Sequence, residues 1–254
     1  LIAGQKFQRA VRLHAMPNPD PASAARDRLA AVRAKRGYLL PHHGLLAVAA
    51  PDLLEAYDQA YTALTLVPRN LTAHDKEFVW LAVLVATDEA IATHHIRKFR
   101  DAGGTSAEMA AALRLAAVAR SAPAFRFVAD HWTAAIPEFD HEQAYRSAIA
   151  DSLAPFGVPA RLTEMALAAV QTCQGGWWEL GVHIRAAYAA GVAEVDLAEA
   201  IAITMFPGSV PYFVDACGIW RDLIKSGAVA ASPAFRAWAE IDQGGFDAAK
   251  AAKP

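Results

Sequence analysis

Cysteine is scarce in this sequence. The 254 residues contain only two cysteines, Cys173 and Cys217, and no CxxC pair. A disulfide framework, a thiolate zinc site and a dithiol redox centre therefore lack their ligands. We expect a protein of a reducing compartment whose function needs neither a metal nor another cofactor.

Strong net charge and long hydrophobic runs are also missing. The 24 Lys and Arg residues nearly balance the 26 Asp and Glu residues, so the chain has no basic field for nucleic acid. No segment reaches the roughly 18 consecutive apolar residues of a membrane helix, and residues 1–20 lack the apolar core of a signal peptide. We therefore expect a cytoplasmic protein whose partner is a small molecule, with neither nucleic acid nor a membrane as a partner.

Alternating β-branched segments are nearly absent, whereas alanine is abundant and apolar residues recur every three or four positions. This pattern predicts an all-α fold. Thr105 and Glu108 have the spacing of a capping box, and Gly103 ends the preceding helix. Residues 36–44, rich in Gly and Pro, predict an irregular segment. The expected helices cover approximately residues 22–35, 51–67, 72–85, 95–102, 109–119, 125–135, 141–153, 159–172, 177–190, 196–205, 210–226 and 232–242.

A short signature occurs twice, 88 residues apart. His95 begins the segment HIR, which is followed by Ala-Gly at 102–103, and His183 begins the same segment, followed by Ala-Gly at 190–191. A duplicated helical unit is the simplest interpretation. We predict an N-terminal extension and first helix over residues 1–50, a first unit over 51–153 and a second unit over 154–254.

The second unit has the clearest candidates for chemistry. Glu179 lies four residues before His183, so the two side chains share one helix face, where a carboxylate can fix the tautomer of an imidazole. Trp177 and Trp178 offer flat apolar walls for a substrate, and Glu164 lies on the preceding helix. The alternative is an ordinary surface pair of Glu179 and His183 beside a tryptophan pair that belongs to the core.

The first unit is chemically different. Glu77 precedes His95 on the preceding helix, but residue 91, four before His95, is an isoleucine. We include Glu89, His94 and His43 as candidates for substrate binding. Adjacent histidines on a helix point about 100° apart, which argues against a shared metal ion at His94 and His95.

Several segments resemble the carboxymuconolactone decarboxylase and alkylhydroperoxidase-D-like superfamily. They are residues 71–77 (LTAHDKE), 93–97 (THHIR), 102–108 (AGGTSAE) and 174–183 (QGGWWELGVH). The resemblance covers about residues 37–228 and implies an all-helical fold of two tandem alkylhydroperoxidase-D-like repeats. It also implies a homo-oligomer, which we expect to be a trimer or a dimer, with active sites at contacts between units or subunits.

The resemblance also separates two kinds of chemistry. Peroxidase members carry a CxxCxxxH segment with an upstream Glu, and both thiols are missing from both units here. Glu164 stands 19 residues before His183 and matches the upstream Glu, whereas Glu77 stands 18 before His95. The positions of the two thiols are occupied by Asp88 and Ile91 in the first unit and by Gly176 and Glu179 in the second.

Three functional hypotheses follow. The first is a cofactor-independent lyase or isomerase for a small unsaturated carboxylic acid, lactone or aromatic-derived compound. In it Glu179 orients His183, His183 moves a proton, Glu164 completes the relay, and His95 with Glu77 forms a parallel site or a partner wall. The second is a non-catalytic protein that binds a small molecule or serves as a scaffold. The third is a thiol-dependent peroxidase that uses Cys173.

Overall fold

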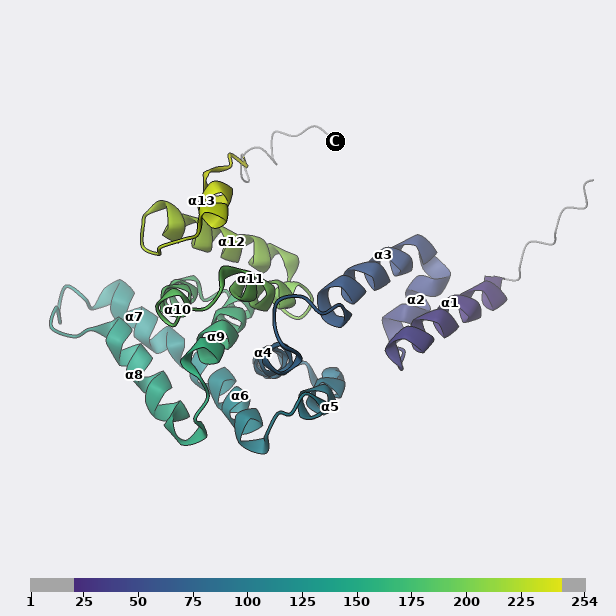
Figure 1. The fold of residues 1–254 in the computed structure, drawn as a ribbon, viewed down its shortest axis with the longest axis horizontal. Coiled ribbons are helices and arrows are strands. Elements are labelled where there is room, and N and C mark those ends of the chain that lie inside the picture. The colour runs from purple at the N-terminus through teal and green to yellow at the C-terminus, as the bar shows by residue number, and fades with distance from the viewer. Residues whose placement is uncertain (1–20, 244–254) are drawn as a thin grey trace, which may run out of the picture. The chain divides into compact units, whose positions relative to one another are not determined.

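The computed structural model describes residues 21–243, and these residues contain helices and turns but no strand (Figure 1). Within this range every helix is too short or too polar to span a bilayer. The chain divides into two compact units after Leu66. The boundaries at 50/51 and 153/154 concern the sequence repeats and stay predictions.

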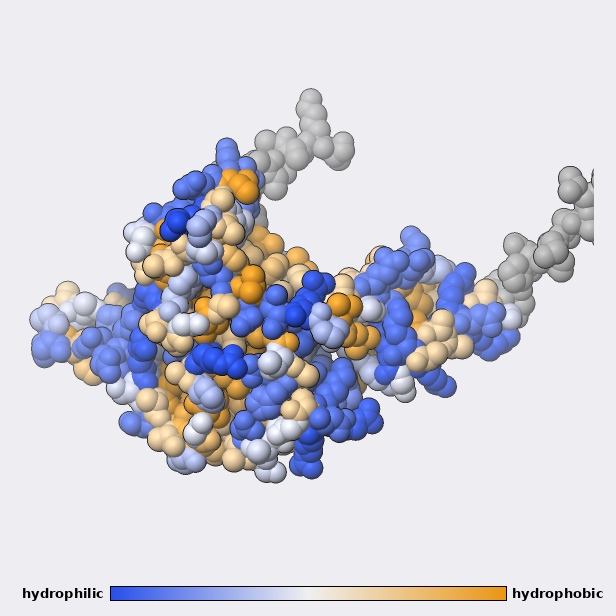
Figure 2. Space-filling model, in the orientation of Figure 1, coloured by the Kyte–Doolittle hydropathy of each residue, from blue (hydrophilic) through white to orange (hydrophobic). Residues whose placement is uncertain are grey.

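The first compact unit, which ends at Leu66 and is distinct from the first sequence repeat, contains three helices around a small core. They are α1 (Pro21–Arg36), α2 (Pro41–Ala49) and α3 (Pro51–Tyr61), and a π-helical turn extends α3 to Leu66. Ala25, Val32, Ala47 and Leu54 form the buried core of this unit. Hydrophilic side chains cover much of the face of the molecule that Figure 2 shows.

The prediction of an irregular segment over residues 36–44 holds for residues 37–40 and is wrong from Pro41 on, where α2 begins. Pro41 occupies the first turn, where its fixed φ angle and missing N–H cost nothing. The backbone N–H of Leu40 donates to Nδ1 of His43 at 3.0 Å, which closes the helix start. His43, a candidate for substrate binding, is fully buried in this cap, and its Nε2 lies 3.0 Å from Arg36.

The second compact unit, which begins at Val67, is built around two buried helices, one from each sequence repeat. Helix α4 (Ala73–Ala86) is buried along almost its whole length, and it packs against α9 (Ala160–Gln174). Helix α6 (Ser106–Ala119) packs against α4, and α10 (Trp177–Ala189) packs against α9. The helices of this unit are α4 (Ala73–Ala86), α5 (His94–Asp101), α6 (Ser106–Ala119), α7 (Ala122–His131), α8 (His141–Leu153), α9 (Ala160–Gln174), α10 (Trp177–Ala189), α11 (Glu194–Ala202), α12 (Val210–Lys225) and α13 (Pro233–Glu240).

The helix ends follow local sequence signals. Thr105 and Glu108 form the expected capping box at the start of α6, with Oγ1 of Thr105 accepting the N–H of Glu108 at 3.1 Å. Gly103 and Gly191, which follow α5 and α10, have φ angles of +89° and +70°. These left-handed conformations are strained for any residue with a Cβ atom, so glycine ends each helix.

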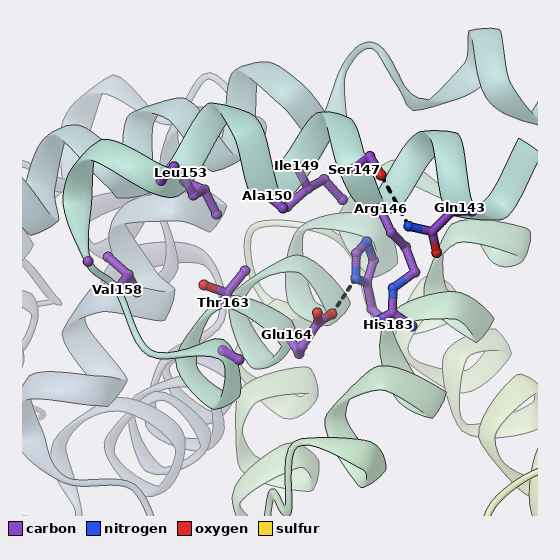
Figure 3. A pocket seen from close by; sticks show the side chains of 13 residues that line it. Gln143, Arg146, Ser147, Ile149, Ala150, Leu153, Val158, Thr163, Glu164 and His183 are labelled. Carbon is purple, nitrogen blue, oxygen red and sulfur yellow. Dashed lines mark hydrogen bonds and ion pairs between the residues drawn. The ribbon is translucent and has the colours of Figure 1, made fainter.

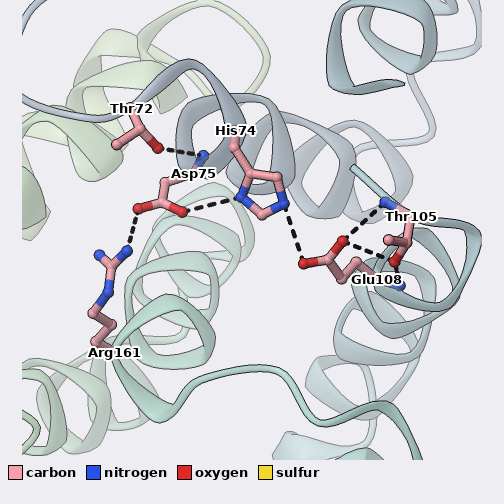
Figure 4. A network of polar contacts seen from close by, with 6 residues as sticks. All are labelled: Thr72, His74, Asp75, Thr105, Glu108 and Arg161. Atoms are coloured by element: carbon pink, nitrogen blue, oxygen red, sulfur yellow. Dashed lines mark hydrogen bonds and ion pairs between the residues drawn. The ribbon is translucent and has the colours of Figure 1, made fainter. Parts of the chain in front are cut away.

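A polar network connects the first turn of α4 to α6 and to α9 (Figure 4). His74 lies 3.2 Å from Asp75 through Nδ1 and 3.1 Å from Glu108 of α6 through Nε2. Asp75 in turn accepts a hydrogen bond from Arg161 of α9. The network therefore connects helices of both repeats at the end of α4 that precedes Glu77.

The tight contact between Gly104 and Phe99 gives a stability prediction. A Cβ atom at Gly104 would lie 2.4 Å from the ring of Phe99, which is fully buried. We expect Gly104→Ala to lower the free energy of unfolding by about 1–3 kcal/mol, because the ring must move within a packed core. Urea denaturation measures the change.

Gly218 provides the matched control. It lies inside α12, and a Cβ atom there would meet no heavy atom within 4 Å. We expect Gly218→Ala to leave stability unchanged or to raise it by up to about 1 kcal/mol. Equal stability of the Gly104→Ala variant and the unsubstituted protein would contradict the packing argument.

Candidate functional site

The centre of the site is a buried pair between α9 and α10. Nδ1 of His183 lies 2.7 Å from Oε2 of Glu164. The side chain of His183 is 1% exposed, whereas that of Glu164 is 15% exposed. The histidine is therefore shielded, and the carboxylate is the member of the pair that reaches open space.

The other ring nitrogen of His183 is also occupied. Nε2 lies 2.8 Å from the hydroxyl of Tyr145 on α8, and the side-chain amide of Gln171 donates to the same hydroxyl at 3.2 Å. Because that hydroxyl accepts from Gln171, it can donate its own proton to Nε2, which places the proton of a neutral imidazole on Nδ1, facing Glu164. Burial raises the pKa of Tyr145 far above its ordinary value, so its proton stays in place at neutral pH.

A pocket of about 450 Å³ opens beside this pair, between α8 and α9 (Figure 3). Glu164 and His183 lie in its wall opposite α8. Its lining combines polar groups with apolar side chains, which suits a small substrate that has both polar and apolar parts. The residues that line it are Gln143, Arg146, Ser147, Ile149, Ala150, Leu153, Ala154, Gly157, Val158, Ala160, Thr163, Glu164 and His183.

The structure corrects the expected pairing of Glu179 with His183. Oε2 of Glu179 accepts a hydrogen bond from Arg126 of α7 at 3.2 Å, and Glu164 is the carboxylate bonded to His183. Glu179 lies in the first turn of α10 and faces α7, whereas α9 brings Glu164 directly to the imidazole. The surface-pair alternative is wrong as well, because Glu179 and His183 are each only 1% exposed.

The two tryptophans do not line this pocket. The ring of Trp178 lies 5.7 Å from that of Tyr145, so it packs behind the residue that holds His183. The ring of Trp177 contacts Tyr212 of α12 at 5.6 Å. Their predicted role as walls for a substrate finds no support in this pocket.

The first repeat contains the same pair. Nδ1 of His95 on α5 lies 2.6 Å from Oε2 of Glu77 on α4, although the spacing is one residue shorter. The indole of Trp80 stacks on the His95 ring at 4.6 Å. Burial, and then the adjacent His95, lower the pKa of His94 to about 4, so His94 is neutral at neutral pH. Glu89 caps the short turn that precedes α5 by accepting the N–H of Ile91.

Both cysteines are poorly suited to thiol chemistry. Burial raises the pKa of the Cys173 thiol to about 12 and also raises that of Cys217. At neutral pH very little of such a thiol is deprotonated, and the thiolate is the reactive form. This argues against the peroxidase hypothesis.

Three residues of the site were not predicted from the sequence: Tyr145, Gln171 and Arg146. The first two complete the hydrogen bonds of His183, and the third lies in the wall of the pocket. Tyr145 is 38 residues from His183 in the chain, so no local spacing rule could have paired them. A buried histidine needs a hydrogen-bond partner for each of its two ring nitrogens. This requirement is the one signal that indicates a second partner for His183 besides a glutamate.

The carboxymuconolactone decarboxylase family matches this chain twice, over residues 51–135 and 140–222. The chain belongs to this family. The two matches confirm the predicted all-α fold with two tandem repeats, and each contains one of the two Glu–His pairs.

A solved structure with a related fold comes from Burkholderia xenovorans LB400. It is described as a "putative gamma-carboxymuconolactone decarboxylase subunit", and it is 19% identical with a TM-score of 0.51. The match covers 83% of this chain and all of the other chain. At this identity the likeness supports the fold alone. No curated protein matches the chain significantly.

The hydroxyl of Tyr145 gives the second prediction. We expect Tyr145→Phe to lower the free energy of unfolding by about 1–3 kcal/mol, because Nε2 of His183 and the amide of Gln171 lose their shared partner. In ¹⁵N NMR spectra the Nε2 resonance of His183 should shift, whereas the Nδ1 resonance, held by Glu164, should change much less.

Tyr188→Phe is the matched control. It removes a hydroxyl that bonds Glu194 at 2.6 Å and Trp220 at 3.1 Å, away from His183. Its stability should also fall, but both ring resonances of His183 should stay in place. An unchanged Nε2 resonance in Tyr145→Phe would contradict the assigned hydrogen bond.

Proposed function

We propose that this member of the carboxymuconolactone decarboxylase family is a cofactor-independent lyase or isomerase that acts on a small unsaturated carboxylic acid or lactone. The observation that carries the proposal is the carboxylate of Glu164, bonded to the buried His183 and exposed in the wall of the pocket. Association into a homo-oligomer and a cytoplasmic location are parts of the same proposal.

The geometry changes the roles expected of the pair. Both ring nitrogens of His183 are occupied by protein groups, so Glu164 exchanges the proton with the substrate carbon. The Nδ1–H group of His183 stabilises the carboxylate form of Glu164, and His183 acts as a positioning residue for it. In isomerisation Glu164 takes a proton from a carbon next to a conjugated carbonyl and returns it to another carbon.

Decarboxylation uses the same groups. The bond between carbon and the departing carboxylate breaks, and its electron pair moves into the conjugated carbonyl of the substrate. Carbon dioxide leaves, and protonated Glu164 delivers its proton to the carbon that carried the carboxylate. The step is balanced without an oxidant, a reductant or a metal ion, provided that Glu164 regains its proton from solvent.

Arg146 is suited to hold a substrate carboxylate. It belongs to the pocket lining, and among residues 21–243 no carboxylate forms an ion pair with it. Arginine binds carboxylates through two parallel hydrogen bonds, which fixes orientation as well as position. A substrate held in this way would present a neighbouring carbon to Glu164.

A second candidate function is binding without catalysis. It is favoured by the complete hydrogen bonding of His183, which leaves the ring no free nitrogen for a substrate. In that case the pocket would hold a small carboxylate that leaves unchanged. Turnover of a bound substrate by the unsubstituted protein distinguishes the two functions.

The proposed chemistry predicts a loss of turnover in Glu164→Gln. We expect carbon dioxide release or isomerisation, screened with unsaturated acids and lactones, to fall by at least 10²-fold, because a glutamine can neither deliver the proton for the first reaction nor accept it for the second. His183→Ala should cause a large loss as well, since Glu164 would lose its partner.

Two controls complete this test. Glu138→Gln alters an exposed carboxylate outside the pocket and should leave turnover unchanged. Glu77→Gln tests whether the first repeat acts in parallel, which would appear as a partial loss. Full turnover in Glu164→Gln would refute the proton-transfer role, and binding of substrates without turnover in the unsubstituted protein would favour the binding function.

The role of Arg146 predicts a change in KM. We expect Arg146→Gln to raise KM for carboxylate substrates by at least tenfold while kcat changes much less, because an ionic hydrogen bond contributes about 1.5–3 kcal/mol. Arg114→Gln, at an exposed position on α6, should leave both parameters unchanged. An unaltered KM in Arg146→Gln would exclude this residue as the carboxylate anchor.

A further inference from the structure

A second and smaller pocket lies beside Glu179. It has a volume of about 200 Å³ and shares no lining residue with the Glu164 pocket. It is formed by the end of α6, the start of α7, the end of α9 and the start of α10. The residues that line it are Ala119, Arg120, Pro123, Arg126, Gln171, Gln174, Gly176 and Glu179.

One oxygen of Glu179 has no partner in this pocket. The side chain of Glu179 is 1% exposed, and its Oε2 accepts from Arg126 at 3.2 Å. Its Oε1 is buried and accepts no hydrogen bond from any described residue. A buried carboxylate oxygen without a donor is costly, so the position calls for a hydrogen-bond donor from outside the chain.

The charges of the pocket are already balanced. Arg126 pairs with Glu179, and Arg120 pairs with Asp88 at 2.7 Å. A cation would meet two guanidinium groups, and an anion would meet the unpaired oxygen of Glu179. A neutral ligand that donates to Glu179 and accepts from Arg126 fits both requirements.

Gly176 allows the polar groups of the pocket to converge. A Cβ atom at this position would lie 2.3 Å from Oε1 of Gln171 and 3.1 Å from Oε2 of Glu179. Any side chain here would displace the amide of Gln171, whose nitrogen donates to Tyr145. The absence of a side chain therefore leaves room beside Gly176 for Oε1 of Gln171 and Oε2 of Glu179.

We propose that Glu179, Arg126, Gln171 and Gln174 form a second binding site, for a small neutral molecule that carries a primary carboxamide or urea group. The N–H of such a group donates to Oε1 of Glu179, and its carbonyl oxygen accepts from Arg126. The pocket, at about 200 Å³, has the volume of about seven water molecules at roughly 30 Å³ each, which admits an amide with a short carbon chain.

The site is separate from the proposed chemistry but connected to it by hydrogen bonds. Gln171 lines the small pocket, and its amide donates to the hydroxyl of Tyr145, which bonds His183. An occupant that moves Gln171 would alter the hydrogen bonding of the Tyr145 hydroxyl, which is the partner of Nε2 of His183, without entering the Glu164 pocket. The proposal itself requires binding alone and does not depend on turnover.

Butyramide is a suitable probe, with sodium butyrate and butylammonium chloride as its charged analogues. In ¹⁵N NMR titrations of the full chain, we expect butyramide to shift the side-chain amide resonances of Gln171 and Gln174 in a saturable way. Either charged analogue should bind at least tenfold more weakly. Shifts of equal size and affinity with all three compounds would overturn the ligand class.

Glu179→Gln tests the site. It keeps the shape of the side chain and removes the carboxylate, and we expect butyramide to bind at least tenfold more weakly. Arg126→Gln, which removes the donor to the carbonyl, should have the same effect if Glu179→Gln does not fold. Melting curves establish that each variant is folded.

Glu164→Gln is the matched control, because it alters a carboxylate of the other pocket. Butyramide affinity should be unchanged in it, so failure of the proposed enzyme function and failure of this site are distinguishable. Unchanged affinity in both Glu179→Gln and Arg126→Gln, or a crystal grown with butyramide that shows only ordered water beside Glu179, would refute the site.

Discussion

A buried imidazole needs a partner for each of its ring nitrogens, and this requirement organises the second repeat. His183 receives Glu164 from the preceding helix on one side and Tyr145 from α8 on the other. Leaving either nitrogen unpaired inside the protein would cost about 1–3 kcal/mol. Helices α8, α9 and α10 are therefore connected at one ring, and their relative positions determine the shape of the pocket.

The same requirement changes how the chemistry is assigned. A histidine with both nitrogens occupied is a poor direct base, because a substrate would have to displace a protein partner first. The carboxylate bonded to it has no such obstacle, since Glu164 is 15% exposed and lies in the wall of the pocket. The imidazole holds that carboxylate in one position through a hydrogen bond. In the proposed proton transfer this is a supporting role.

The duplication preserved one half of this arrangement and changed the other. In both repeats the Nδ1 atom of the histidine meets a glutamate from the preceding helix, at 2.6 Å for His95 and 2.7 Å for His183. The rest of each imidazole has different surroundings. A tyrosine hydroxyl bonds His183, whereas an indole stacks on His95. The two pairs have a common geometry but do not offer a substrate the same groups.

Much of the fold could be predicted from the sequence because its signals are local. Helical periodicity, the capping box at Thr105 and the glycines after α5 and α10 each act within a few residues. The end of segment 36–44 was misjudged because its Gly and Pro residues suggested a loop, whereas Pro41 fits the first turn of a helix and His43 caps it through its ring.

The site was predictable only in part, because its decisive contacts join different helices. The spacing of four residues suggested Glu179 as the partner of His183, but that rule describes neighbours on one helix surface and takes no account of a second helix packed against it. Glu164 was found by its spacing of 19 residues, through resemblance to the family. Tyr145 had no signal of either kind, since its contact arises only when α8 packs near α10.

Glu77 and Glu164 each pair with a histidine of their own repeat, and other ion pairs join the two repeats. Helices α4 and α9 pack against each other, and each carries a carboxylate that faces its own histidine. Polar links at the start of α4, from Asp75 to Arg161 and from Lys76 to Glu199 at 3.2 Å, attach this helix to the second repeat. A slide of α4 along α9 would break these links, whereas each Glu–His pair joins two helices of the same repeat. The links between the repeats therefore hold α4 against the second repeat, and the Glu–His pairs hold α5 to α4 and α10 to α9.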